Sequence, residues 1–147
     1  MVKNIADAQE IVQYCPVIQL VEGNVVIILQ VAQVGRELTQ VLVLDGNIML
    51  TERDEFIYDE MITHVPMAVH PCITRVLVIG VGDGGVVREL TRYGQIERID
   101  LVEMDEMVAE ACRQYLPENA CRLDDDRVHI YYENALKTKI ARTHHLR

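Results

Sequence analysis

The sequence predicts an α/β fold in which a small β-hairpin lobe precedes the first half of a doubly wound parallel sheet. Three observations lead to this prediction. Residues 17–51 contain many β-branched side chains and two turn signals, a helical pattern begins after Thr51, and strand and helix patterns alternate from residue 75. We therefore expect an N-terminal β-rich lobe over residues 1–51 and a partial α/β domain over residues 52–147.

The turns of the first lobe are EGN at 22–24 and DGN at 45–47, and apolar runs flank each of them. This arrangement is typical of consecutive β-hairpins. Thr51 and Asp54 then have the spacing of a helix-capping pair. In the helix that follows, apolar residues recur on one face at Ile57, Met61 and Val65, and we expect the helix to end at Pro66.

The second part of the chain alternates strictly. The run RVLVIG reads as a short apolar strand, VVRELTRYG as a helix, RIDLVEMD as a strand, EMVAEACRQYLP as a helix and DDDRVHIYY as a strand. This order favours parallel pairing with right-handed crossovers. Residues 134–147 offer at most one short basic helix. Because three parallel strands leave an edge and faces uncovered, we expect a fragment of a larger fold or a chain that needs a partner.

Composition excludes several classes of function. The formal charge is 14 − 23 = −9 without a long basic run, which argues against nucleic acid as the main partner. No apolar stretch is long enough for a membrane span and no signal core begins the chain, so we expect a cytoplasmic protein. The cysteines form no CxxC pair, which predicts neither a zinc site nor a disulfide framework: Cys15, Cys72, Cys112 and Cys121.

The candidate site begins with a glycine-rich turn between a strand and a helix. Gly80, Gly82 and Gly85 satisfy G-x-G-x-x-G, and Glu103 ends the next strand at the spacing of a ribose-binding carboxylate. Asp83 stands inside this loop, where an anion would disfavour pyrophosphate and favour an amine or a sulfonium. The alternative is a plain strand-to-helix turn with a solvated Glu103.

Four stretches together resemble the spermidine synthases, the polyamine aminopropyltransferases. They are LDGNIMLTERDEFIYDEMITHVP, RVLVIGVGDGGVVREL, LVEMDEMV and CRQYLPENACRLDDDRV, and the resemblance covers about residues 38–135. It implies a small N-terminal β domain followed by a methyltransferase-like Rossmann domain, of which this chain contains the first half. It also implies transfer of an aminopropyl group from decarboxylated S-adenosylmethionine to putrescine, giving spermidine and methylthioadenosine.

The resemblance assigns site residues position by position. Those implied to bind the polyamine are Tyr58, Asp59 and Asp83. Those implied to bind the nucleoside are Gly80, Gly82, Gly84, Glu103, Asn134 and Ala135. Without the resemblance, Tyr58 reads as a tyrosine packed on Ile62 and Val65. Gln30 is a candidate for a further nucleoside contact upstream.

Three positions depart from the family pattern. Val81 replaces a loop glycine and adds a side chain where close approach is expected, Asp59 replaces a histidine, and Asn134 replaces a carboxylate. The family's D-S-x-D-P segment, which holds its catalytic aspartate, is not found in these 147 residues. We therefore assign no catalytic residue and expect turnover to be very low or nil unless another chain completes the site.

The implied ligands are putrescine and decarboxylated S-adenosylmethionine as co-substrate, with no cofactor and no metal, in a homodimer or homo-oligomer. Two alternatives stay open. One is a methyltransferase that uses S-adenosylmethionine, which would bind the nucleoside through a similar loop and acidic strand end but would not need the hairpin and helix of residues 44–66. A non-catalytic fragment that oligomerises through its β lobe is the other.

Overall fold

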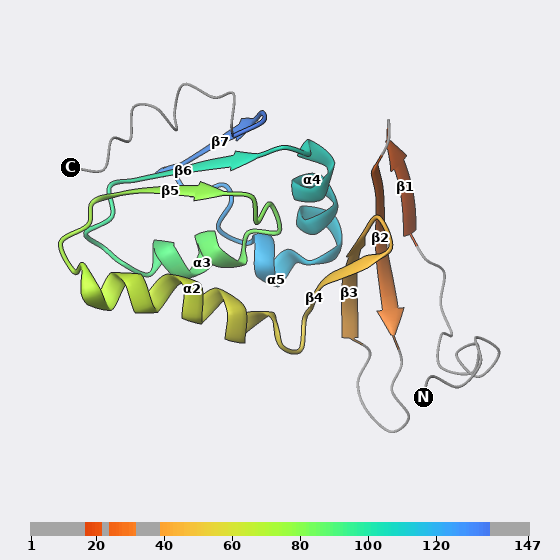
Figure 1. Cartoon of the computed structure of the whole chain (residues 1–147), viewed down its shortest axis with the longest axis horizontal. Coiled ribbons are helices and arrows are strands. Elements are labelled where there is room, and N and C mark those ends of the chain that lie inside the picture. Colours follow the sequence, from red (N-terminus) through yellow and green to blue (C-terminus); the bar gives the residue numbers. More distant parts are fainter. Residues whose placement is uncertain (1–16, 22–23, 32–38, 136–147) are drawn as a thin grey trace. The chain divides into compact units, whose positions relative to one another are not determined.

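The computed structural model describes residues 17–21, 24–31 and 39–135 of the chain (Figure 1). The chain divides into two compact units between Glu55 and Phe56. The division into domains at residue 51 stays a prediction.

The first unit contains an antiparallel sheet in the order β1-β2-β3-β4. Its strands are β1 (Val17–Val21), β2 (Asn24–Val31), β3 (Thr39–Leu44) and β4 (Asn47–Thr51). The β3–β4 turn is the predicted DGN turn. Asp45 and Gly46 both have positive φ, 49° and 79°, as a two-residue hairpin turn of type I′ requires. Gln30 pairs with Gln40 between β2 and β3, but its side chain lies outside the described part of the structure.

The second unit contains three parallel strands in the order β5-β6-β7. The strands are β5 (Arg75–Ile79), β6 (Arg98–Glu103) and β7 (Val128–Tyr132). The helices after the glycine loop are α3 (Gly85–Thr91), α4 (Glu106–Tyr115) and α5 (Pro117–Ala120). Figure 1 shows α2 (Glu55–Val69) and α3 along the same side of this sheet. The predicted α/β fold class is confirmed.

The core of the second unit lies between the sheet and its helices. β6 is buried along almost its whole length, and α3 and α4 each turn an apolar face toward it. The most deeply buried side chains here are Val87, Ile96, Ile99, Leu101, Val102, Cys112 and Leu116. Among the described residues, no helix is both long and apolar enough to cross a membrane.

The prediction that α2 ends at Pro66 was wrong, because the helix continues through it to Val69. Pro66 lacks the N–H of a normal helical residue, yet its own carbonyl accepts a hydrogen bond from the N–H of His70 at 2.9 Å, so the helical pattern resumes beyond it. The face that carries Ile57, Met61 and Val65 is exposed, and the buried side chains of the helix are Asp59, Thr63 and Met67.

The beginning of α3 explains why Asp59 is on the buried face of α2. Gly85 begins α3 without a side chain, and the space that this leaves is filled by the carboxylate of Asp59. Helical spacing identifies which residues of α2 share a face, but the neighbouring element decides which face is buried.

Candidate nucleoside and amine site

The carboxyl ends of the three parallel strands form the floor of the candidate site. The N–H of Gly80, just after β5, donates to the carbonyl of Val102 at 2.8 Å. On the other side, the N–H of Glu133 donates to the carbonyl of Glu103 at 2.9 Å. These bonds extend the ladders past the ends of the strands, so the loops on both sides are joined to the end of β6. Ligands of open α/β sheets bind at this edge.

The glycine loop follows a path that side chains disfavour. Gly80, Val81 and Gly84 all have positive φ, at 76°, 64° and 95°. A Cβ on Gly84 would also approach the α5 backbone, at 3.0 Å from the Ala120 Cα and from the Asn119 carbonyl oxygen. Gly84 therefore meets two requirements, conformational and steric, whereas Val81 is a β-branched residue in a region that such residues rarely adopt.

The carboxylate of Glu103 holds this loop. Its Oε2 accepts a hydrogen bond from the N–H of Gly82 at 3.0 Å. Its Oε1 accepts from the N–H groups of Met104 and Asp105, at 2.7 and 3.0 Å. A Cβ on Gly82 would lie only 2.8 Å from the Glu103 Cγ, so the glycine is needed for this contact. The predicted pairing of the glycine loop with the acidic end of the second strand is thus present in the structure.

Asp83 lies half-buried in the loop, close to the start of α3. Its Oδ1 accepts a hydrogen bond from the N–H of Gly85 at 2.9 Å. Burial raises the pKa of the Cys112 thiol, and the negative charges of Asp83 and Glu103 raise that pKa further. Both carboxylates therefore act on the same buried thiol from nearby positions. This concentration of negative charge suits a cationic ligand.

The remaining nucleoside candidates, Asn134 and Ala135, follow the end of β7 and are half-buried. Tyr132 at the end of β7 pairs with Glu103 at the end of β6. The structure thus brings Asn134 and Ala135 to the same sheet edge as Glu103 and the glycine loop.

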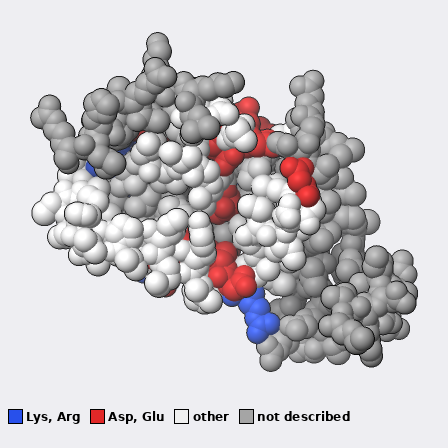
Figure 2. Space-filling model, viewed as in Figure 1, with Lys and Arg blue, Asp and Glu red and all other residues white. Residues whose placement is uncertain are grey.

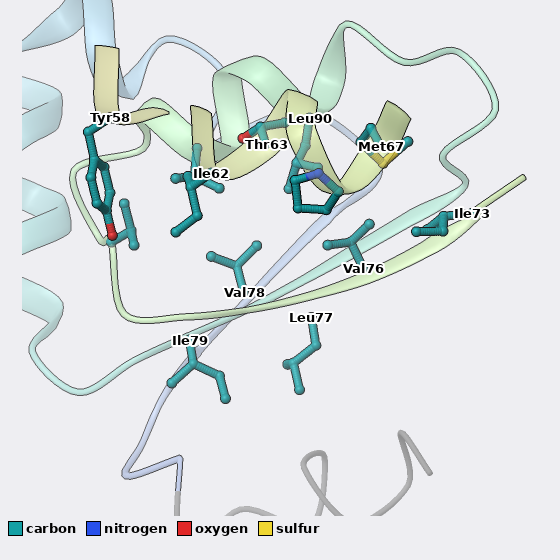
Figure 3. Close-up of a pocket in the computed structure, with 13 residues that line it drawn as sticks. Tyr58, Ile62, Thr63, Met67, Ile73, Val76, Leu77, Val78, Ile79 and Leu90 are labelled. Atoms are coloured by element: carbon teal, nitrogen blue, oxygen red, sulfur yellow. The ribbon is translucent and has the colours of Figure 1, made fainter. Parts of the chain in front are cut away.

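Tyr58 lies on α2, near Val81 of the glycine loop. It lines an apolar cavity of about 320 Å³ that lies between α2, β5 and α3, together with Ile62, Val78 and Val81 (Figure 3). Its side chain is 59% exposed, so tight packing on Ile62 and Val65 is not its role. Among the predicted site residues, only Tyr58 lines this cavity, and the Asp83 and Glu103 carboxylates lie outside it.

Asp59, the third residue predicted to bind the polyamine, is only 2% exposed. It lies on the side of α2 that faces α3, whereas Tyr58 beside it is exposed. The two neighbouring residues therefore face different surroundings, although the sequence resemblance assigned both to one ligand.

A polar cluster that sequence reasoning missed joins α2 to α3. His64 Nδ1 and the Tyr93 hydroxyl share a hydrogen bond of 2.7 Å, and His64 Nε2 lies 3.2 Å from Glu89 Oε2. One oxygen each of Glu60 and Glu89 and one nitrogen of His64 lie within 4.8 Å of one another, a spacing that could hold a metal ion. The spacing of Glu60 and His64, one helical turn apart, is the sequence signal that could have indicated the cluster.

The buried carboxylate of this cluster already has cationic partners. Arg92 approaches Glu89 Oε2 at 2.6 Å and Arg88 approaches Oε1 at 3.0 Å. Burial alone would raise the pKa of Glu89, but the hydrogen bonds and charges of Arg92 and Arg88 outweigh burial and lower that pKa. The cluster is therefore a structural link that is balanced in charge without an added cation.

The face of the molecule shown in Figure 2 carries many acidic side chains and few basic ones. This distribution agrees with the net charge of −9 and with a preference for cationic ligands over nucleic acid.

The comparisons with known proteins agree with these observations. Residues 55–141, more than half of the chain, match the spermine/spermidine synthase domain family. A polyamine aminopropyltransferase of Lachnoclostridium phytofermentans is 60% identical over 101 residues, which are 69% of this chain and 36% of the relative. One from Clostridium perfringens is 62% identical over 94 residues, which are 64% of this chain and 33% of the relative.

Solved structures give the same result. A spermidine synthase in complex with the transition-state analogue AdoDATO matches with a TM-score of 0.74 and 39% identity, over 81% of this chain and 41% of that protein. The spermidine synthase of Thermotoga maritima matches with a TM-score of 0.73 and 40% identity, over 80% and 40% of the two chains. The chain thus spans about two fifths or less of the relatives that it matches. On the strength of its family match and its fold, the chain belongs to the spermine/spermidine synthase family.

Proposed function

We propose that this chain binds decarboxylated S-adenosylmethionine and a diamine as the binding part of an aminopropyltransferase of the spermidine synthase type. The observation that carries the proposal is the pair of carboxylates, Asp83 and Glu103, at a bare glycine loop on the carboxyl edge of the sheet. The ligand carries a sulfonium and an ammonium group, and both are attracted by this negative charge.

The reaction explains why such a site needs charge and orientation. The nitrogen lone pair of a diamine such as putrescine attacks the carbon next to the sulfonium sulfur, and a C–N bond forms. The C–S bond breaks, its electron pair returns to sulfur, and neutral methylthioadenosine leaves. The attacking amine loses a proton, so the reaction needs a base and close alignment of the two substrates.

Each predicted residue then has a role. Glu103 accepts hydrogen bonds from the ribose hydroxyls, while Gly80, Gly82 and Gly84 leave room for the nucleoside, and Asn134 and Ala135 contact the adenine. Asp83 attracts the cationic chain, and Tyr58 and Asp59 belong to the amine side. We assign the base to no residue of this chain.

The test is a calorimetric titration of the purified chain with decarboxylated S-adenosylmethionine and with methylthioadenosine. Asp83→Asn should weaken binding of the cationic compound by about tenfold or more, because a charge-assisted contact contributes about 1.5–3 kcal/mol. Binding of the neutral thioether should change little. Asp126→Asn is the matched control, because Asp126 is exposed and lies before β7, away from the loop.

Equal weakening of both compounds by Asp83→Asn would contradict the charge role of Asp83. If the wild-type chain binds neither compound, the proposal fails and the non-catalytic fragment is favoured.

Association into a homodimer or homo-oligomer through the β lobe is part of the same proposal. Ile48 and Met49, on opposite faces of β4, are 70% and 57% exposed, so each leaves a large apolar side chain open to contact. Sedimentation should therefore give a smaller mass for Ile48→Lys than for the wild-type chain.

A cytoplasmic location is supported by Cys72 and Cys121, which are exposed free thiols.

A further inference from the structure

Asp59 is a carboxylate buried in an unusual place. It lies on α2 with only 2% of its surface exposed, while its neighbour Tyr58 is 59% exposed. Burying a carboxylate is costly unless it has specific partners. The position of Asp59 therefore requires an explanation other than solvation.

The Asp59 carboxylate lies directly against Gly85. If Gly85 carried a Cβ, that atom would overlap the Asp59 carboxylate, which fills the space where a side chain would stand. The φ angle of Gly85 is not positive, so the backbone there accepts any L residue. The need for glycine at position 85 thus comes from Asp59 and not from backbone conformation.

Gly85 is also the residue that holds Asp83, because its N–H donates to Asp83 Oδ1 at 2.9 Å. Gly85 consequently touches two carboxylates. The Asp59 carboxylate approaches from α2 and lies where a side chain of Gly85 would stand. The Asp83 carboxylate accepts the Gly85 N–H from within the loop. Movement of Asp59 would shift Gly85 and, through that hydrogen bond, would shift Asp83.

We infer that Asp59 is a positioning residue, which fixes the first turn of α3 and thereby the direction of the Asp83 carboxylate. The inference rests on the proposed function for its effect on ligands, and on the Asp59–Gly85 contact for its effect on structure.

The structural part is tested by a double-mutant cycle in urea. Gly85→Ala should lower the unfolding midpoint, whereas Gly94→Ala should not, because a Cβ on Gly94 meets no atom within 4 Å. In the Asp59→Ala background, Gly85→Ala should be neutral or stabilising, since alanine is a better helix former than glycine. Purely additive effects of the two changes would overturn the inference.

The positioning part is tested by hydrogen exchange of the Gly85 amide. Asp59→Ala should reduce the protection of this amide at least tenfold while the β6 amides keep theirs, and Asp59→Asn, which keeps the shape, should restore most of it. If the Gly85 amide is as protected in Asp59→Ala as in the wild type, Asp59 does not position the turn.

Ligand binding separates positioning from contact. Asp59→Ala should weaken decarboxylated S-adenosylmethionine several-fold more than methylthioadenosine, because only the cationic compound depends on the charge of Asp83. In the Asp83→Asn background, Asp59→Ala should bring no further selective loss. A selective loss that is equally large in that background would show that Asp59 does not act through Asp83 and would overturn the inference. If the wild type binds neither compound, the proposed function fails, but the urea cycle and the exchange of Gly85 still decide the role of Asp59.

Discussion

Glu103 accepts a hydrogen bond from the N–H of Gly82 at 3.0 Å, across 21 positions of sequence. The same carboxylate accepts two further N–H groups at the end of its own strand. A single side chain thus fixes the loop after β5 to the turn after β6.

Glu103→Gln should destabilise the chain. The new amide nitrogen must face at least one backbone N–H donor, and an unsatisfied buried donor costs about 1–3 kcal/mol. Urea denaturation measures this change in the free energy of unfolding. Glu110→Gln on the exposed side of α4 is the control and should stay within about 0.5 kcal/mol of the wild type. Equal stability of the two variants would mean that the Glu103 hydrogen bonds contribute nothing.

Val81→Gly should stabilise the chain by about 1 kcal/mol, because glycine adopts the φ of 64° at this position without strain. The gain is smaller than the full strain, since glycine loses more backbone entropy on folding. Thermal unfolding of the two proteins measures the difference. Val87→Gly, at a fully buried position of α3, should instead lose about 3 kcal/mol. A loss of stability in Val81→Gly would show that packing of the valine outweighs its strain.

Tyr93→Phe should cost about 1 kcal/mol, the usual net contribution of one hydrogen bond, because it removes the hydroxyl that bonds to His64. The free energy of unfolding in urea at neutral pH measures the change. Tyr115→Phe on α4 provides a control of the same chemistry and should be close to neutral. If both variants behave alike, the link between α2 and α3 does not depend on this hydrogen bond.

Asp125 makes the free energy of unfolding depend on pH in the acidic range. Hydrogen bonds from the Arg127 side chain and backbone lower the pKa of Asp125 to about 2. A carboxyl whose pKa is lower in the folded state stabilises that state above its ordinary pKa near 3.9, and the contribution disappears as the pH falls toward about 2. The difference in stability between the wild type and Asp125→Asn should therefore be constant above about pH 5 and shrink between about pH 4 and 2.

Urea midpoints measured at several pH values follow this difference. Asp126→Asn, at the exposed neighbouring position, should show no comparable change over the same range. A difference that stays constant down to pH 2 would contradict the role of the Asp125–Arg127 pair.

Much of this architecture was predictable because local patterns and long-range packing agree. The run at 76–79 is apolar and lies between Arg75 and the glycine loop, and it forms most of β5. The dipeptide Asp45–Gly46 accepts positive φ at both positions and forms the hairpin turn. The glycine loop and Glu103 were predictable as a pair because strand ends in a parallel sheet meet at one edge.

The rest depended on contacts between elements that sequence spacing does not reveal. Asp59 is buried because α3 begins with a glycine, and this relation becomes visible only when α2 and α3 lie together. The meeting of His64 with Glu89 joins residues 25 positions apart on two helices. Nothing in either helical pattern alone indicates that the two side chains would meet.

The hydrogen bonds from Gly80 and Glu133 to the end of β6 have one more consequence. They preorganise the floor of the site, so little backbone entropy remains to be lost when a ligand arrives. Under the proposed function, discrimination between diamines of different length would come from side chains outside this rigid frame. Tyr58, which is exposed on α2, would then be free to adapt to the length of the diamine, whereas Glu103 is held by its hydrogen bonds.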